Sequence, residues 1–569
     1  MKLFVILHAN CETMRYFCIL LSLLASAVSL RAQVMPALPW TASQSPKYEV
    51  RAVWLTVIGG LDWPSTSNQE QQKRDLAIIL DRLKDAGVNT VLIQTRVRGT
   101  VIYPSSMEPW DGGFSGQPGV APKYDPLQLC VDECHRRGME CHAWVVTIPL
   151  GKWDKIGAQQ LRKAKPRLVK RIGEDAFMDP ENPETATYLA NICQEITRNY
   201  DIDGIHLDYI RYPEQWRIKV ARAKGREYIT NIVRAINNAV KSQKPWVKLS
   251  CSPIGKHDNL TRYSAGGWNA RNAVCQDAQA WLRDGLMDQL YPMMYFQGDN
   301  FYPFAIDWKE HSYGRTIVSG LGIYFLDPRE GRWTLDMLER QMHVLRQLGL
   351  GHCYFRSRFF TDNVKGIYDF GQLFDATPAL VPPMTWAGRP APSAPTKLEL
   401  DGNTLKWSGA QDRSGAPGIL YNVYASEDYP VDISLAENLV ATRIPTTSLL
   451  VPQGKKNYAV TAMNRYGQES AAKQLLLNAG PVYAAPIIAR SDGSAIALPP
   501  KGSVLDAEIV VIEDMKGQQV AVRPYTKLLY ISNLPDGLYQ LRSLGRKGRS
   551  HRIGFFAKKS SEILNKTKK

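Results

Sequence analysis

The sequence predicts an α/β protein built on a (β/α)8 barrel, also called a TIM barrel, that is followed by two small all-β sandwich domains. From about residue 49 to residue 375, short β-branched runs alternate with amphipathic segments of helix length. After residue 376 the composition becomes proline-rich, and beyond it strand-like alternation replaces the helical pattern. Because 569 residues exceed what one hydrophobic core usually organises, we expect two to four domains.

Eight apolar runs are the predicted barrel strands, at 50–58, 90–97, 140–148, 204–210, 248–254, 287–295, 316–325 and 351–359. The segments between them carry helix signals. Leucines at helical spacing stop at Gly87, and Asp125-Pro126 and Asn182-Pro183 each offer a cap followed by a first-turn proline. Eight strands with helical crossovers favour a closed barrel. No glycine-rich phosphate loop follows any strand, which argues against an open dinucleotide-binding sheet.

The remaining chain divides at composition changes. Residues 1–32 are typical of a signal peptide, whose start is better placed at Met14, because Arg15 then precedes the apolar run. Residues 33–376 form the predicted barrel and 377–390 a linker. Residues 391–478 resemble a fibronectin type III module, 484–558 are a second β-sandwich, and 559–569 are a basic tail. We expect an exported protein, periplasmic or on the surface of a Gram-negative bacterium, with no transmembrane segment after signal removal.

The charge and the cysteine content limit the binding partners and ligands that we expect for this protein. The net charge of +16 comes from scattered basic residues without a nucleic-acid fold signature, so we expect no nucleic acid and at most a preference for acidic surfaces or anionic glycans. The cysteines lie in apolar segments. The set nearest to a metal pattern is Cys130, Cys134, Cys141 and His142, but its spacing matches no zinc motif. We therefore expect buried free thiols, no metal site and no cofactor.

Candidate site residues follow the strands, because barrel active sites lie at the C-terminal strand ends. On the fourth strand, alternation places His206 and Asp208 on one face, while Asp203 precedes the strand and suits a turn or cap. The other candidates for substrate binding are Asp62, Trp63, Gln94, Arg96, Tyr103, Trp110, His142, Trp144, Arg211 and Tyr295.

These residue types indicate glycoside chemistry. Cleaving a glycosidic bond needs a carboxylic acid for the leaving oxygen and a second carboxylate as nucleophile or base, and aromatic side chains stack on sugars. In the alternative interpretation the aromatics only cap the barrel, and the carboxylates only pair with Arg96 and Arg211. The fourth strand is similar to that of amylase-type barrels. However, His206 replaces their arginine, and the fifth strand brings no glutamate.

A set of longer motifs resembles the glycosyl hydrolase-like family ten. They are residues 49–56, 61–64, 103–105, 108–110, 124–127, 142–144 and 203–213. The resemblance implies an exported bacterial barrel enzyme, and one branch of the family hydrolyses peptidoglycan glycan strands stripped of their peptides. It points to Glu108 as a catalytic acid with Asp208 as its partner. Tyr209 departs from many relatives, which have a second aspartate there.

The leading hypothesis is therefore a glycoside hydrolase that acts on a bacterial glycan, above all peptidoglycan strands, with Glu108→Gln expected to abolish cleavage and preserve the fold. Two alternatives stay open: a glycosidase for host or dietary polysaccharide, and a non-catalytic glycan-binding surface protein. The expected partners are the glycan itself and components of the cell wall or outer membrane.

Overall fold

The computed structural model describes residues 45–451, 456–477, 487–490, 495–498, 507–515, 517–545 and 550–558. The predicted signal peptide and basic tail lie outside the described residues. Within the described part of the chain, no helix combines the length and hydrophobicity that a membrane crossing requires.

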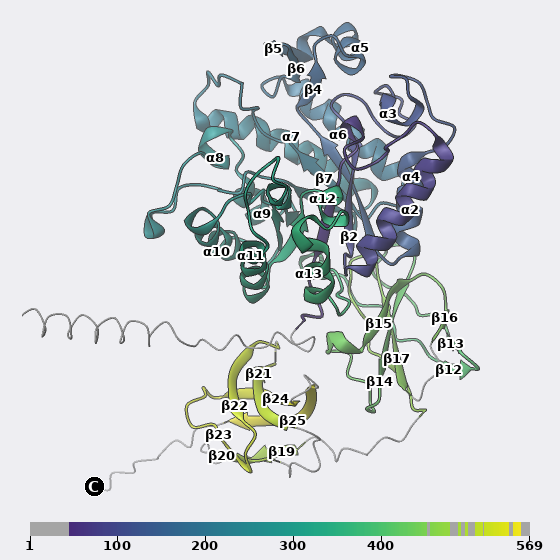
Figure 1. Cartoon of the computed structure of the whole chain (residues 1–569), viewed down its shortest axis with the longest axis vertical. Coiled ribbons are helices and arrows are strands. Elements are labelled where there is room, and N and C mark those ends of the chain that lie inside the picture. Colours follow the sequence, from purple (N-terminus) through teal and green to yellow (C-terminus); the bar gives the residue numbers. More distant parts are fainter. Residues whose placement is uncertain are drawn as a thin grey trace, which may run out of the picture.

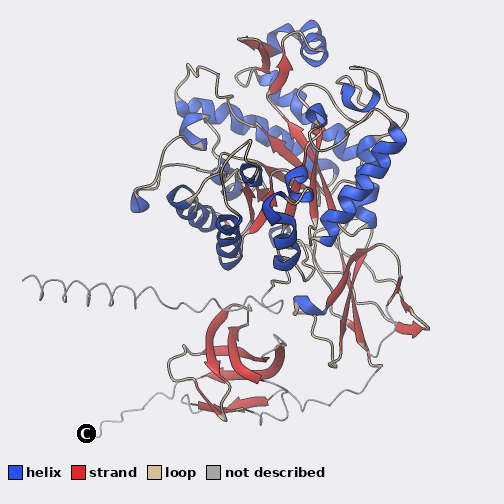
Figure 2. Cartoon of the chain, viewed as in Figure 1, coloured by secondary structure: helices blue, strands red, loops and turns tan. Residues whose placement is uncertain are grey.

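Eight parallel strands close into a barrel (Figures 1 and 2). In barrel order they are β1 (Arg51–Leu55), β2 (Thr90–Arg96), β3 (Glu140–Val146), β7 (Gly204–Asp208), β8 (Lys248–Cys251), β9 (Gln289–Leu290), β10 (Thr316–Leu321) and β11 (Gly351–Tyr354). The predicted (β/α)8 fold is confirmed. The observed strands end before the predicted runs do, because the last residues of each run belong to the loops at the barrel mouth.

Helices surround the barrel, and two of them begin at the caps that the sequence predicts, Asp125 and Asn182. The longer ones are α2 (Gln69–Asp85), α4 (Pro126–Arg136), α6 (Pro183–Asn199), α7 (Arg222–Gln243), α9 (Ala278–Arg283), α10 (Tyr302–Glu310), α11 (Leu335–Gln347) and α13 (Ile367–Phe374), with short turns at α3 (Gly112–Ser115), α8 (Ala270–Ala273) and α12 (Ser357–Thr361). The carboxylate of Asp125 accepts a hydrogen bond from the Gln128 amide, and Asn182 caps α6 in the same way through the Glu184 amide. Gly87 follows α2 with a φ of 77°, a conformation that glycine adopts without strain.

Buried side chains form two layers on opposite sides of the barrel wall. Trp54, Trp144 and Tyr291 belong to the cluster inside the barrel. A larger cluster fills the space between the strands and the outer helices, and it includes Val145 and Tyr188. Adjacent residues of one strand therefore face different environments, as strand alternation requires.

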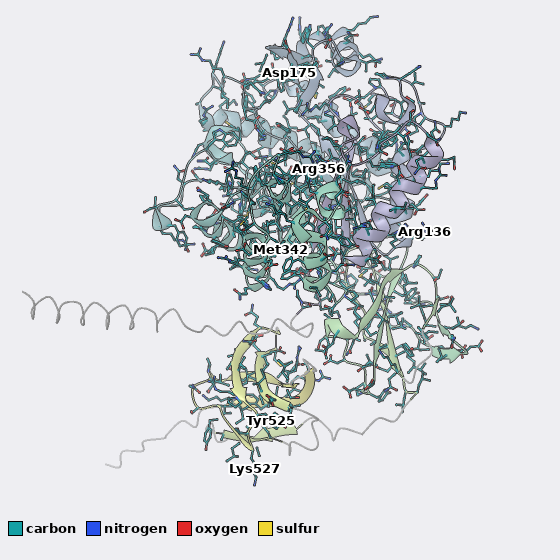
Figure 3. The ribbon with its side chains drawn as sticks, in the orientation of Figure 1. Arg136, Asp175, Met342, Arg356, Tyr525 and Lys527 are labelled. Carbon is teal, nitrogen blue, oxygen red and sulfur yellow. The ribbon has the colours of Figure 1, made fainter. Side chains whose placement is uncertain are left out.

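An excursion after β3 adds α5 (Ile156–Ala164) and a small antiparallel sheet of β4 (Pro149–Lys152), β5 (Val169–Ile172) and β6 (Asp175–Met178). Lys152 and Asp175 pair across it at 3.1 Å. The excursion rises from the C-terminal ends of the barrel strands, and Asp175 lies near the top of the molecule (Figure 3). It therefore borders the barrel mouth.

In the residues that the structure describes, the first all-β part contains seven strands in two sheets. One sheet orders β12 (Leu398–Asp401), β13 (Thr404–Trp407) and β16 (Ser448–Leu450), and the other β15 (Leu439–Ile444), β14 (Leu420–Ser426), β17 (Asn457–Met463) and β18 (Lys473–Leu475). Leu405, Trp407, Tyr421 and Val460 share its core. The fibronectin type III assignment stays a prediction.

The second all-β part has a five-stranded sheet, β19 (Ile487–Arg490), β25 (Ser550–Lys558), β24 (Gly537–Gly545), β21 (Ala507–Asp514) and β22 (Gln519–Pro524), and a pair, β20 (Ala495–Ala497) with β23 (Leu528–Tyr530). Tyr525 packs in its core, whereas Lys527, two residues on, is exposed (Figure 3).

The first sandwich is fastened to the N-terminal end of the barrel. Arg443 reaches from β15 to Asp203 at 2.5 Å and to Glu140 at 3.1 Å, both at strand starts. The predicted linker packs on the same end, because the Trp386 indole donates to Asp288 and the Met384 amide donates to Tyr466. The barrel mouth lies at the opposite end.

Candidate active site

Asp208 is the carboxyl group at the centre of the barrel mouth. It ends β7, and one of its oxygens accepts hydrogen bonds from the Ser252 hydroxyl at 2.9 Å and from the Tyr209 amide at 2.8 Å. The indole of Trp144, inside the barrel on β3, lies 3.3 Å from its other oxygen. Three separate segments therefore fix the orientation of this carboxyl.

Burial raises the pKa of the Asp208 carboxyl above its ordinary value, because ionisation there would place a charge in a poorly solvated site. The hydrogen bond from Ser252 and the positive charge of Arg211 act in the opposite direction without cancelling the effect. A carboxyl group that keeps its proton to higher pH is suited to donate it to a leaving oxygen.

His206 lies one layer below Asp208 in the barrel interior. Burial holds its pKa well below the ordinary value, so the imidazole is neutral. Its Nε2 accepts a hydrogen bond from the Trp54 indole at 3.2 Å, which leaves the proton on Nδ1 to be donated to Ser250 at 2.9 Å. His206 thus supports the floor of the site rather than carrying charge.

Aromatic rings form one wall of the mouth. Tyr295, Tyr324 and Phe355 follow three successive barrel strands and contact one another with ring centroids 5.4 to 5.8 Å apart. Phe325 continues the wall at 4.1 Å from Tyr324. All four rings are half-buried, and Tyr295 lies within the electrostatic reach of Asp208. Half-exposed aromatic faces beside a carboxyl group are suited to stack on sugar rings.

A second carboxylate follows Asp208 on the same loop. Tyr209 adopts a left-handed backbone conformation with φ of 53°, and the Arg211 guanidinium lies 4.2 Å from its ring centroid. Arg211 also pairs with Glu214 at 2.7 Å. Both Asp208 and Glu214 act electrostatically on Tyr209. The loop therefore brings an exposed carboxylate, Glu214, to the surroundings of the buried one.

Glu108 lies on the other side of the barrel wall. A bulge between Gln94 and Arg96 places Arg96 opposite Val145, a residue of the outer layer. There the guanidinium forms two hydrogen bonds with the Glu108 carboxylate, at 2.6 and 2.7 Å, and Tyr188 of α6 donates a third at 3.1 Å. The structure thus holds Glu108 in a buried ion pair and does not bring it to Asp208.

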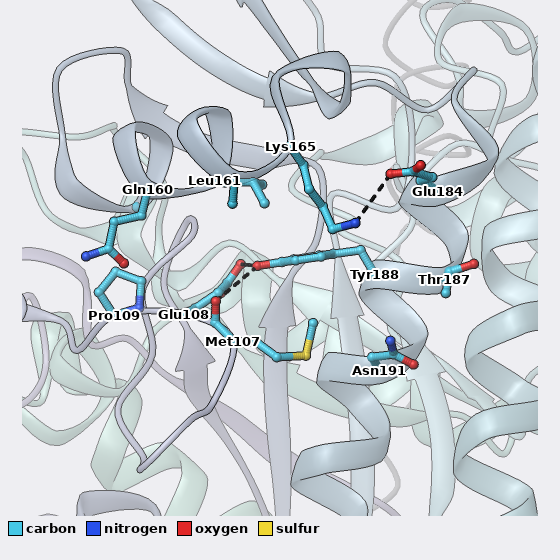
Figure 4. Close-up of a pocket in the computed structure, with 12 residues that line it drawn as sticks. Met107, Glu108, Pro109, Gln160, Leu161, Lys165, Glu184, Thr187, Tyr188 and Asn191 are labelled. Carbon is cyan, nitrogen blue, oxygen red and sulfur yellow. Dashed lines mark hydrogen bonds and ion pairs between the residues drawn. The ribbon is translucent and has the colours of Figure 1, made fainter.

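Glu108 and Tyr188 line a pocket of about 590 Å³ (Figure 4). Its wall comes from the loop at Met107–Pro109, from α5 and from α6. Figure 4 shows the Lys165 ammonium directed toward Glu184, 3.5 Å away, across the rim. This pocket lies outside the barrel wall and is separate from the mouth.

Several other predicted site residues stabilise the loops through hydrogen bonds and ion pairs. Asp62 pairs with Arg356 at 2.5 Å near the barrel centre (Figure 3), and it joins the loops after β1 and β11. The indole of Trp63 is buried and donates to the Gln72 carbonyl. The side-chain oxygen of Gln94 accepts hydrogen bonds from two backbone amides of the loop after β1. Tyr103 is buried and donates to Glu195.

Two further predicted residues lie away from Asp208. Trp110 is half-buried in a β-bridge with Val101. His142 pairs in register with Gly204, at the start of β7, and contacts Glu140 at 3.0 Å, so it belongs to the lower barrel layer. Of the predicted set, the structure gathers Asp208, Trp144, His206, Arg211 and Tyr295 at or beneath the mouth.

Sequence reasoning missed Ser252, Glu214, Tyr324 and Phe355. Ser252 directly follows β8 and Phe355 directly follows β11, so the rule of strand ends could have found both. Tyr324 lies in a short 3-10 helix after β10, where the predicted strand was drawn too long. Glu214 lies six residues past its strand, and only the folded loop relates it to Asp208.

Within the described residues, the groups that could hold a metal are Cys130, Cys134 and Cys141, and Glu49 with His352 and Asp375. The second group already has cationic partners, because Arg51 and Arg346 pair with both of its carboxylates. It is an ion-pair network at the N-terminal end of the barrel.

The protein is a closed eight-stranded parallel barrel that carries a buried carboxyl group and an aromatic wall at its C-terminal end. Its class is therefore a (β/α)8 barrel with an acidic mouth. Residues 49–221 and 219–318, just under half of the chain, match the family model Glycosyl hydrolase-like 10, so the barrel is similar to that family. The match supports a hydrolase that acts on a glycan.

The chain is similar to curated bacterial proteins and, more distantly, to solved structures. The chain is 26% identical over 492 residues to Glycosyl hydrolase YngK of Bacillus subtilis, covering 77% of this chain and 95% of the relative. It is 28% identical over 301 residues to Glycosyl hydrolase DigH of Escherichia coli K12, covering 45% and 68%. An endo-1,4-beta-D-mannanase from Thermotoga petrophila is 12% identical with a TM-score of 0.39, covering 58% of this chain and all (100%) of that one.

Proposed function

We propose that this chain is a glycoside hydrolase that uses Asp208 as its general acid. The observation that carries the proposal is the buried carboxyl group, held by Ser252 and Trp144, with its pKa raised at the mouth of the barrel. A protonated Asp208 donates its proton to the glycosidic oxygen as the bond to the anomeric carbon breaks. The names of the relatives, both glycosyl hydrolases, support the reaction class.

The second carboxylate in this proposal is Glu214. It lies on the loop that follows Asp208, its side chain is 44% exposed, and its partner Arg211 holds it beside Tyr209. An exposed carboxylate can activate the water that attacks the anomeric carbon, which is the role of the base in glycoside hydrolysis. Glu108, which the sequence favoured, instead neutralises the buried Arg96 in this proposal.

The proposed substrate is the glycan strand of peptidoglycan after removal of its peptides, met in the periplasm or at the cell surface. This choice depends on the family resemblance. The aromatic wall of Tyr295, Tyr324 and Phe355 suits stacking on any pyranose and is equally compatible with a host or dietary polysaccharide.

The test is turnover of amidase-treated peptidoglycan by purified wild-type protein, the Asp208→Asn and Glu214→Gln variants, and a surface control, Asp362→Asn, whose side chain is 59% exposed. We expect shortened saccharides from the wild type and the control, and a loss of roughly 100- to 10,000-fold in each active-site variant. Unchanged turnover by Asp208→Asn would refute the role of that residue.

A non-catalytic glycan-binding protein is the second candidate, and the observation in its favour is the separation of Glu108 from Asp208 by the barrel wall. Such a protein binds glycan strands without shortening them. Calorimetric binding together with unaltered strand length for the wild type would support it over hydrolysis.

A further inference from the structure

Three cysteine thiols meet on the outer side of the barrel wall, in the layer between the strands and the helices. Cys130 and Cys134 lie one turn apart on the same face of α4, and Cys141 lies on β3. Their sulfur atoms all lie within 4.8 Å of one another, and those of Cys130 and Cys141 are 4.0 Å apart. The fold therefore brings together three members of the set Cys130, Cys134, Cys141 and His142, for which the sequence predicted free thiols and no metal site.

The surroundings of these thiols are apolar and closed. All three cysteines are fully buried, at 0% exposure, within the outer hydrophobic layer. His142 follows Cys141 but faces the barrel interior, where it contacts Glu140. His135, near the end of α4, is engaged with Asp203. Within the described residues, no fourth histidine, cysteine or carboxylate completes the group.

The spacing of the sulfur atoms fits a three-coordinate metal ion. A metal–sulfur bond is about 2.3 Å, so an ion at the centre of an equilateral triangle of sulfurs requires sulfur–sulfur distances of about 4.0 Å. That is the separation of Cys130 and Cys141. Two rigid elements, a helix and a central barrel strand, hold the ligands in place before any ion arrives.

We propose that Cys130, Cys134 and Cys141 form a buried thiolate site for a soft monovalent ion, Cu(I). Soft thiolate ligands select ions of this kind, whereas structural Zn²⁺ sites are almost always four-coordinate and tetrahedral. Each thiol that binds the ion as a thiolate releases its proton to solvent. The site is independent of the proposed glycan chemistry, because it lies on the far side of β3 from Asp208.

The experiment titrates reduced, full-length protein with Cu(I) under anaerobic conditions against a chromophoric Cu(I) chelator. We expect one tight equivalent in the wild type. Each of Cys130→Ala, Cys134→Ala and Cys141→Ala should weaken binding by more than the 10- to 100-fold typical of losing an outer-shell partner. The matched control is Cys251→Ala, which removes an equally buried thiol of β8 and should leave Cu(I) binding unchanged.

X-ray absorption of the Cu(I)-loaded wild type keeps the proposal testable if an alanine variant fails to fold. Three sulfur ligands at about 2.3 Å would support it. Absence of tight binding in the wild type, equal binding by folded Cys141→Ala, or a first shell with nitrogen or oxygen would overturn it. Binding of Zn²⁺ as tight as that of Cu(I) would overturn the choice of ion.

Discussion

The guanidinium of Arg443 lies 2.5 Å from the carboxylate of Asp203, which places a sandwich residue in the N-terminal end of the barrel. Asp203 also accepts hydrogen bonds from His135 and from the Cys141 amide, and Glu140 beside it binds Lys248. Arg443 thus joins a buried network of barrel residues, and a second arginine of the sandwich, Arg465, lies 3.6 Å from Asp203. The first sandwich therefore contributes to the stability of the barrel.

Replacing Arg443 with methionine should destabilise the barrel, because Asp203 and Glu140 would lose a buried positive partner. Breaking a buried ion pair from one side costs about 3 to 5 kcal/mol. Urea unfolding followed by tryptophan fluorescence measures the change. The control is Arg340→Met on the exposed face of α11, for which we expect a change within about 0.5 kcal/mol. Equal stability of the two variants would contradict the role of Arg443.

Asp208→Asn should remove activity and alter the dependence of stability on pH. Since burial raises the folded-state pKa of Asp208, its contribution to stability is complete below the ordinary value of about 4 and is lost as the pH rises through the raised value. The variant lacks this loss, so its melting temperature relative to the wild type should increase as the pH rises from about 4. A constant difference across that range would show that Asp208 is not a buried acid.

Ser252→Ala should move the alkaline limb of the activity profile to higher pH. The Ser252 hydroxyl donates to the Asp208 carboxylate and thereby favours its ionised form. Without this donor the pKa of Asp208 rises further, and the protein keeps its protonated acid to higher pH. The pH dependence of kcat/KM measures the shift, with Ser319→Ala, a buried serine of β10, as the control. A shift to lower pH would contradict this account.

Glu108→Gln separates the two interpretations of that residue. The family resemblance predicts lost cleavage with an intact fold, whereas the ion pair with Arg96 predicts a loss of about 3 to 5 kcal/mol in unfolding free energy. Thermal unfolding and turnover below the melting temperature are measured on the same preparation. A stable but inactive variant would return Glu108 to the catalytic site.

Tyr324→Ala should weaken glycan binding more than it slows the reaction. Loss of one ring from the aromatic wall removes about 1 kcal/mol of stacking, so KM should rise by roughly fivefold to tenfold with a smaller change in kcat. Tyr313→Ala is the control, since this exposed tyrosine precedes β10 at the other end of the barrel. Equal KM values for the two variants would place the glycan elsewhere.

The barrel could be predicted because its signals are local. Each strand begins within two residues of its predicted start, and the caps at Asp125 and Asn182 open α4 and α6. The strand ends were placed too late for a physical reason. Phe325, Phe355 and Tyr295 extend the apolar runs in the sequence. They line the barrel mouth, however, and form no part of the hydrogen-bonded strands.

The site was less predictable because it depends on which face of the wall a residue occupies. Alternation is sufficient for Asp208 and His206, which face the interior. Alternation fails for Arg96, because a β-bulge turns the Arg96 side chain toward the outer layer, where it pairs with Glu108. A bulge has no clear sequence signal here, and neither does the meeting of Glu214 with Arg211.

The fastening of the sandwich through Arg443 also determines how the molecule can be presented to a polymer. The contacts of Arg443, Trp386 and Met384 occupy the end of the barrel opposite to Asp208, so they leave the approach to the carboxyl group clear. A protein immobilised on beads or a cell surface through its C-terminal half would therefore turn its mouth outward. A long glycan strand could then cross the mouth without passing the surface to which the protein is attached.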